Sequence, residues 1–155
     1  PTEEMDLSSA HATVKTPIIG EMIIEVVFSI FERLKGVQGD PNSWTPEVAE
    51  LYGKPVYDSG NYKAPLAMMR MVPDGPNHTS ASALRKIEEY VQSLEIPAEI
   101  VWGMNDPILG KGLSIMKENF PDAPVTETPA GHFLQEEVPL EIAEALKRVI
   151  SKIKN

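Results

Sequence analysis

The sequence predicts an α/β fold with two parallel strands, near residues 98–103 and 123–128. The first strand is indicated by the apolar run Ile100-Val101-Trp102, which suits a position buried in a sheet. The segment between the strands, 108–119, has a helical pattern, and a helix that connects two strands in this way makes them parallel. Because parallel strands run in one direction, the loops that follow them lie on the same edge of the sheet.

Composition limits the classes of protein that the chain resembles. Its 155 residues suffice for one domain, which would bury roughly 68–70% of the surface of its unfolded chain. The net charge of −9 disfavours nucleic acids and anionic membranes as partners. The absence of cysteine excludes disulfides and thiolate zinc sites and fits a cytoplasmic protein. The acidic, polar N-terminus predicts no signal peptide, and no glycine-rich phosphate loop, metal site or cofactor is expected.

The N-terminal part predicts a polar, irregular segment over residues 1–16 and a helix from Pro17 to about Lys35, ended by Gly36. The helix has a wide apolar face, whereas two glutamates, Glu21 and Glu25, argue against a membrane span. Such a face needs partners on more than one side.

Further helices follow along the chain. A short helix is predicted to begin with Thr45 as its N-cap and Pro46 at its first position, before a turn-rich stretch at 55–61. A second short helix covers 62–72 and an amphipathic helix covers 80–94. The last helix, 139–154, is predicted to bury an apolar stripe formed by Ile142, Leu146, Val149, Ile150 and Ile153.

Two side chains that carry chemistry follow the two predicted strands. Asp106 follows the first strand and His132 the second, and Gly131 permits the turn from which the imidazole projects. Taken singly, Asp106 is an ordinary Asp-Pro turn residue and His132 an ordinary loop histidine. Together, on one edge of a sheet, they match the last two members of a nucleophile-acid-histidine triad in the chain order of α/β-hydrolases.

The residues around this pair carry a family resemblance. The runs Val101-Trp102-Gly103-Met104-Asn105-Asp106-Pro107-Ile108-Leu109-Gly110 and Ala130-Gly131-His132-Phe133-Leu134-Gln135-Glu136 resemble the acid and histidine loops of haloalkane dehalogenases. Thr45-Pro46-Glu47 and the stretch from Tyr62-Lys63-Ala64-Pro65 to Met71-Val72-Pro73 resemble parts of their helical cap. The resemblance implies a strand exit or linker at 1–16, a helical cap at 17–75 and the C-terminal part of an α/β-hydrolase main domain at 76–155.

A hydrolase of this family also needs a nucleophile, on a sharp turn written G-x-S-x-G or G-x-D-x-G. No two glycines in this sequence are four positions apart. The resemblance therefore implies that the chain is the C-terminal half of a hydrolase, with His132 and Asp106 as catalytic residues. The nucleophile is expected on an N-terminal half, as a missing segment or a separate chain.

The resemblance implies that an aspartate displaces halide from a small apolar substrate to form an alkyl ester, which water activated by His132 hydrolyses. Trp44 is a candidate for halide binding through its indole N–H, and Met68 a candidate for the substrate pocket. The alternative for each is an ordinary packed side chain with no role in binding. Three N-terminal carboxylates are rivals to Asp106, and His11 reads as a surface residue; the rivals are Glu3, Glu4 and Asp6.

Three alternatives remain open from the sequence. A serine nucleophile would make the protein an esterase, and an aspartate with cap phenols would make it an epoxide hydrolase; the phenols would be Tyr52, Tyr57 or Tyr62. The chain could also be a non-catalytic binding module whose helix at 17–35 docks on a partner.

Overall fold

The computed structural model describes residues 16, 30–61 and 63–153. The predicted helix at 17–35 therefore lies outside the described residues except for its end. Glu3, Glu4, Asp6, His11 and Tyr62 also lie outside them. The chain divides into two compact units, one formed by Pro1–Arg33 with Pro46–Arg85 and the other by Leu34–Thr45 with Lys86–Asn155.

Within its described residues, the first unit is helical. It contains α3 (Ile30–Arg33), α4 (Pro46–Ser59), α5 (Ala64–Met71) and the start of α6 (Ala81–Gln92). The predicted start of α4 at Pro46 and the short helix at 62–72 are confirmed, the latter as Ala64–Met71. The described end of the helix predicted at 17–35 is α3, followed by a 3-10 turn at Leu34–Val37.

The turn-rich stretch predicted at 55–61 is wrong for its first five residues. Helix α4 continues through Pro55 to Ser59 and stops before Gly60, whose φ of +64° favours glycine. Proline in a helix removes one backbone hydrogen bond. Packing compensates, because the Tyr57 ring occupies the space over Gly53 and meets the Phe31 ring edge-on at 5.8 Å.

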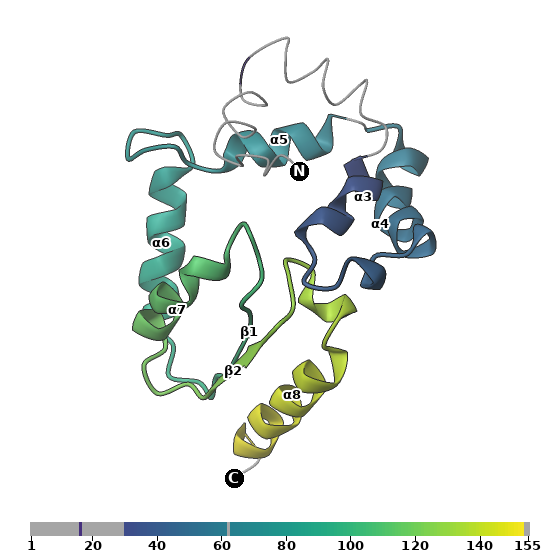
Figure 1. Ribbon diagram of the computed structural model, residues 1–155. Coiled ribbons are helices and arrows are strands. Elements are labelled where there is room, and N and C mark those ends of the chain that lie inside the picture. Colours follow the sequence, from purple (N-terminus) through teal and green to yellow (C-terminus); the bar gives the residue numbers. More distant parts are fainter. Residues whose placement is uncertain (1–15, 17–29, 62, 154–155) are drawn as a thin grey trace. The chain divides into compact units, whose positions relative to one another are not determined.

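The second unit contains a parallel two-stranded sheet, which confirms the predicted fold class. Strands β1 (Ile100–Gly103) and β2 (Val125–Thr128) lie side by side, with Ile100 opposite Val125 and Gly103 opposite Thr128 (Figure 1). Both strands are two residues shorter at their start than predicted. Because they end opposite each other, the loops that follow begin at the same edge of the sheet.

The connection between the strands is helical over only part of its predicted range. A 3-10 turn at Gly110–Gly112 leads into α7 (Leu113–Asn119), and the residues before it form a turn. Helix α6 and the last helix, α8 (Pro139–Ile153), agree with the predicted helices at 80–94 and 139–154 to within two residues at each end.

The predicted buried stripe of α8 is wrong in part. Ala145 is buried, whereas Leu146, Ile150 and Ile153 are exposed. On α6, Leu84 and Ile87 are also exposed, although the amphipathic pattern predicted for 80–94 puts both on one apolar face. The sheet has only two strands and covers a narrow strip of α8, so the flanks of the α8 stripe stay exposed. None of the helices in the described ranges combines the length and the apolar character needed to cross a membrane.

Candidate functional site

The loops after β1 and β2 are joined beyond the ends of the strands. The Met104 and Asn105 backbone N–H groups donate to the carbonyls of Thr128 (2.9 Å) and Ala130 (3.1 Å). The Asn105 side-chain amide donates to the Pro129 carbonyl at 2.7 Å. The pairing of the strands thus continues into the loops that carry Asp106 and His132.

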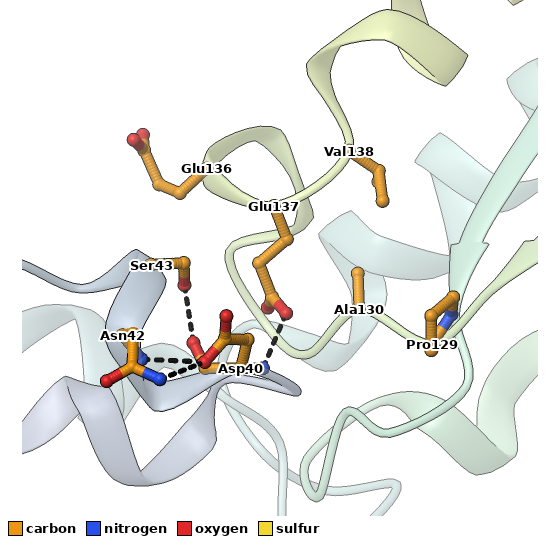
Figure 2. A pocket seen from close by; sticks show the side chains of 8 residues that line it. All are labelled: Asp40, Asn42, Ser43, Pro129, Ala130, Glu136, Glu137 and Val138. Atoms are coloured by element: carbon orange, nitrogen blue, oxygen red, sulfur yellow. Dashed lines mark hydrogen bonds between the residues drawn. The ribbon is translucent and has the colours of Figure 1, made fainter.

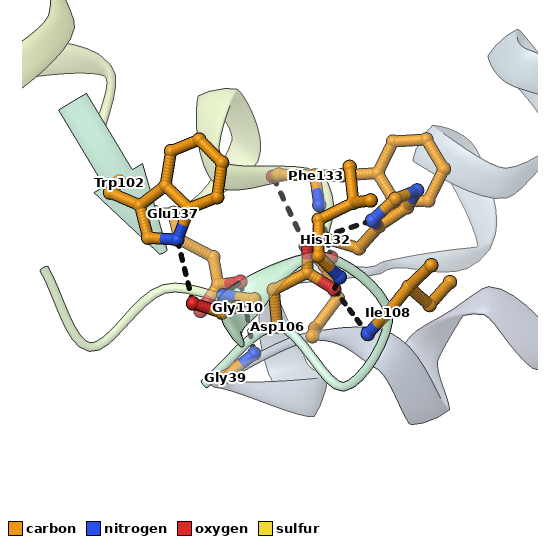
Figure 3. A network of polar contacts seen from close by, with 11 residues as sticks. Gly39, Trp102, Asp106, Ile108, Gly110, His132, Phe133 and Glu137 are labelled. Carbon is orange, nitrogen blue, oxygen red and sulfur yellow. Dashed lines mark hydrogen bonds and ion pairs between the residues drawn. The ribbon is translucent and has the colours of Figure 1, made fainter. Parts of the chain in front are cut away.

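Asp106 uses its two oxygens for different purposes. Oδ1 accepts hydrogen bonds from the backbone N–H groups of Ile108 (2.7 Å) and Leu109 (3.0 Å), which closes a tight turn. Oδ2 lies 2.9 Å from Nδ1 of His132 (Figure 3). The Asp106 side chain is only 9% exposed. The turn therefore aims one carboxylate oxygen at the histidine and shields it from water.

His132 lies at the end of this contact, and its ring has a second nitrogen, Nε2. When Nδ1 carries the proton and donates to Asp106, Nε2 has a lone pair and can accept a proton. Within the described part of the chain, no hydrogen bond to Nε2 is found, and the side chain is 26% exposed. The ring meets Phe133 edge-on at 5.1 Å. This arrangement suits a general base held in one tautomer.

Glu137 forms a second carboxylate-centred network close to His132. Its Oε1 accepts from the backbone N–H groups of Gly39 (3.0 Å; Figure 3) and Gly131 (2.8 Å), and Oε2 accepts from that of Asp40 (2.7 Å; Figure 2). Glu137 was not among the predicted site residues, although it directly follows the run Ala130–Glu136. The position of Glu137, five residues after His132, can be read from the local sequence. Its hydrogen-bond partners at positions 39 and 40 cannot, because they are remote in the chain.

Gln38 fixes the other side of the histidine. Its amide is buried, with Oε1 accepting from the Phe133 N–H at 2.9 Å and Nε2 donating to the Phe133 carbonyl at 3.3 Å. Nε2 also donates to Ser43 Oγ at 3.1 Å, and the His132 N–H donates to the Val37 carbonyl at 2.8 Å. Sequence reasoning missed Gln38 as well, because 95 positions separate it from Phe133.

Glycines allow these backbones to approach so closely. A side chain at Gly131 would collide with the backbone of Val37, Gln38 and Gly39, and one at Gly39 with the Pro129 carbonyl. At Gly103, a Cβ would lie 2.7 Å from the Ala130 carbonyl oxygen. Gly131 has no positive φ. Glycine suits this position because the neighbouring backbone leaves no room for a side chain.

An open pocket of about 420 Å³ lies beside the Glu137 network (Figure 2). It is lined by part of segment 40–43 on one side and by residues 129–130 and 136–138 on the other. Asp40 at its rim accepts hydrogen bonds from the backbone and side chain of Asn42. Among the described residues, no group of three or more histidine, cysteine or acidic side chains is arranged to hold a metal ion.

Trp44 and Met68, the candidates for halide binding and for the substrate pocket, lie in different units. Trp44 is in the second unit, 5% exposed, with its ring 4.7 Å from that of Phe133. Met68 is on α5 in the first unit and is 71% exposed. The structure thus brings together Asp106 and His132, and it places Trp44 against the residue that follows His132. The roles of all four side chains remain predictions.

Comparison with known proteins indicates a relationship to α/β-hydrolases. The chain is similar to haloalkane dehalogenase 1 of Mycobacterium tuberculosis and of Mycobacterium bovis, with 30% identity over 98 residues. The match covers 61% of this chain but only 33% of each relative, so the chain corresponds to about a third of the length of these curated relatives. No protein-family profile and no solved structure matches the chain. The parallel strands with their helices are consistent with a fragment of an α/β-hydrolase fold.

Proposed function

We propose that the chain is the C-terminal part of a hydrolase that resembles haloalkane dehalogenases, and that His132 and Asp106 are two members of its catalytic triad. The single observation that carries this proposal is the 2.9 Å contact between His132 Nδ1 and Asp106 Oδ2 at the shared edge of two parallel strands. The distant similarity to haloalkane dehalogenase 1 supports the same reading. In this proposal the cap is 17–75, the main domain begins near 76, and the protein works in the cytoplasm.

The proposed reaction has two steps. An aspartate carboxylate from an N-terminal segment attacks the carbon that bears the halogen; a carbon–oxygen bond forms, the carbon–halogen bond breaks and halide leaves. Nε2 of His132 then takes a proton from a water molecule, which attacks the carbonyl carbon of the ester. The bond between the carbonyl carbon and the alcohol oxygen then breaks, Nε2 returns the proton to that oxygen, and the alcohol leaves. The Asp106 carboxylate stabilises the imidazolium that exists between the two proton transfers.

The first test identifies the nucleophile. Denaturing mass spectrometry of the purified, undigested protein lists every polypeptide present, and halide release from a short 1-haloalkane is measured on the same material. A polypeptide with a G-x-D-x-G turn, together with halide release, supports the proposal. A serine in that turn with hydrolysis of a p-nitrophenyl ester favours the esterase alternative. If the material is this chain alone, we expect no halide release until a nucleophile-bearing N-terminal segment is supplied.

The second test assigns His132. In the protein that carries its nucleophile, His132→Phe should form the alkyl ester and stop, because no base activates water for the second step. Mass spectrometry should then show the alkyl group on the aspartate. His78→Phe is the matched control, since His78 is hydrogen-bonded to Ser80 in the other unit. Multiple turnovers by His132→Phe at the rate of the control would exclude His132 from the mechanism.

A further inference from the structure

We propose that Glu137 and Gln38 are positioning residues for His132, an inference that rests on the proposed function. Three consecutive backbone N–H groups surround the histidine, and each donates to a different acceptor. The Gly131 N–H donates to the Glu137 carboxylate, the His132 N–H to the Val37 carbonyl and the Phe133 N–H to the Gln38 side chain. The loop is therefore held at the histidine and on both sides of it.

Glu137 joins two segments that are remote in sequence. A single carboxylate accepts three backbone hydrogen bonds, of 2.7, 2.8 and 3.0 Å, from Asp40, Gly131 and Gly39. Hydrogen bonds to a charged acceptor are about twice as strong as neutral ones. The carboxylate thus fixes the distance between the backbone at 39–40 and the peptide that precedes His132. It does so through backbone N–H groups, whereas the hydrogen bond of the imidazole goes to Asp106.

Gln38 performs the corresponding task after the histidine. Its amide engages both the N–H and the carbonyl of Phe133, as a neighbouring strand would, and Ser43 Oγ accepts a further bond from Nε2. The side chain is only 7% exposed, so water competes little for these groups. The Phe133 ring that Gln38 helps to place also meets the imidazole edge-on.

The hydrogen bonds of Glu137 and Gln38 affect the contact between His132 and Asp106. The Asp106 turn is built within its own loop, so the orientation of the imidazole relative to it depends on how the histidine loop is held. An error of about 1 Å in placing a reacting group can reduce the rate about 10²-fold. Loss of Glu137 or Gln38 should therefore lower the rate of ester hydrolysis without removing any group that reacts.

The test uses Glu137→Gln, which retains the shape of the side chain but replaces one oxygen with a donor. That NH₂ group must face either the Asp40 N–H or the N–H groups of Gly39 and Gly131, so one side of the network is broken. Glu127→Gln is the matched control, because Glu127 loses the same charge from an exposed position on β2. Both variants are compared with the unaltered protein by NMR of the ¹⁵N-labelled His132 imidazole and by thermal unfolding.

We expect Glu137→Gln to lose the downfield Nδ1–H proton signal of His132 at temperatures well below its Tm, and Glu127→Gln to keep it. In the protein that carries its nucleophile, we expect ester hydrolysis to fall about 10²-fold for Glu137→Gln, with little change in KM. A purely structural role would lower Tm but leave the His132 signal unchanged in the folded protein. That result would overturn the proposal.

The NMR readout separates this inference from the proposed function. If the unaltered protein releases no halide in the presence of its nucleophile, the proposed function fails, and the His132 signal alone decides whether Glu137 positions the ring. If Glu137→Gln does not fold, Gln38→Met decides, because it removes both hydrogen bonds to Phe133 at similar side-chain size. An unchanged His132 signal in folded Gln38→Met would then overturn the proposal.

Discussion

The two loops that carry Asp106 and His132 are held in different ways. The Asp106 turn, at residues 106–110, is closed locally, since its carboxylate accepts from residues two and three positions ahead and the Gly110 N–H donates back to the Asp106 carbonyl. Met104 and Asn105, which are bonded to the end of β2 and the loop after it, precede this turn. The His132 loop depends on Val37, Gln38 and Glu137, two of which are about 95 positions away in sequence.

The difference indicates where each part of the site is vulnerable. A local turn re-forms whenever its own few residues are present, because little chain entropy is lost in closing it. A loop held by distant residues forms only when the intervening chain has folded around it. We therefore expect the turn at 106–110 to tolerate changes elsewhere in the chain better than the His132 loop does.

The largest effect is expected from Asp106→Asn, a change that keeps the hydrogen bonds of the turn but alters the contact with His132. The amide oxygen can still accept from Ile108 and Leu109, while the amide N–H faces His132 and favours the wrong tautomer of the ring. Turnover of the protein that carries its nucleophile should fall on the order of 10⁴-fold, as in serine protease triads, with little change in Tm. Asp122→Asn, an exposed aspartate after α7, is the control. Unchanged turnover would show that Asp106 does not support His132.

Gly131→Ala and Gly110→Ala compare the two loops directly by stability. A methyl group at Gly131 collides with the backbone at 37–39, so the free energy of unfolding should fall by about 3 kcal/mol. At Gly110 the nearest atom is the Met104 carbonyl oxygen at 3.3 Å, and the change should stay within about 1 kcal/mol. Urea unfolding followed by circular dichroism measures both. Equal losses of unfolding free energy in the two variants would contradict the proposed difference between the two loops.

Thr128→Val probes the junction between the strands and the loops. Thr128 Oγ1 donates to the Trp102 carbonyl at 3.0 Å from a buried position, and valine leaves that carbonyl without this bond. The free energy of unfolding should fall by about 1 kcal/mol. Thr126→Val, on the same strand, should change it by less than about 0.5 kcal/mol. An unchanged free energy of unfolding in Thr128→Val would show that the hydroxyl contributes no stability at this junction.

The smallest effect is expected from Glu127→Gln. Its ion pair with Lys117 spans 3.2 Å, and both side chains are about half exposed. Solvent screens such pairs, so the loss should be below about 0.5 kcal/mol and should vanish in 1 M salt. The measurement is urea unfolding at low and high salt. A loss as large as that of Gly131→Ala would remove the distinction between the network around His132 and ordinary surface contacts.

Local sequence patterns predicted much of the second unit. The two strands, the last helix and the loop positions of Asp106 and His132 follow from apolar runs and from the direction of parallel strands, which need no knowledge of distant contacts. Local rules failed at Pro55, where packing of Tyr57 on Gly53 outweighs the tendency of proline to end a helix. They also failed for Leu146 and Ile150, because periodicity identifies an apolar face but not what covers it.

By itself, the sequence predicted two side chains, Asp106 and His132, as candidates for chemistry, and it determined on which edge of the sheet they lie, since strand direction and turn residues are local properties. Only the tertiary structure decided how His132 is held. Glu137 and Gln38 act through backbone groups of residues 39, 40, 131 and 133, and backbone groups are the same in every residue, so their partners leave no mark in the sequence. The 2.9 Å contact of Asp106 with His132 thus combines a local turn with a loop that only the folded chain can place.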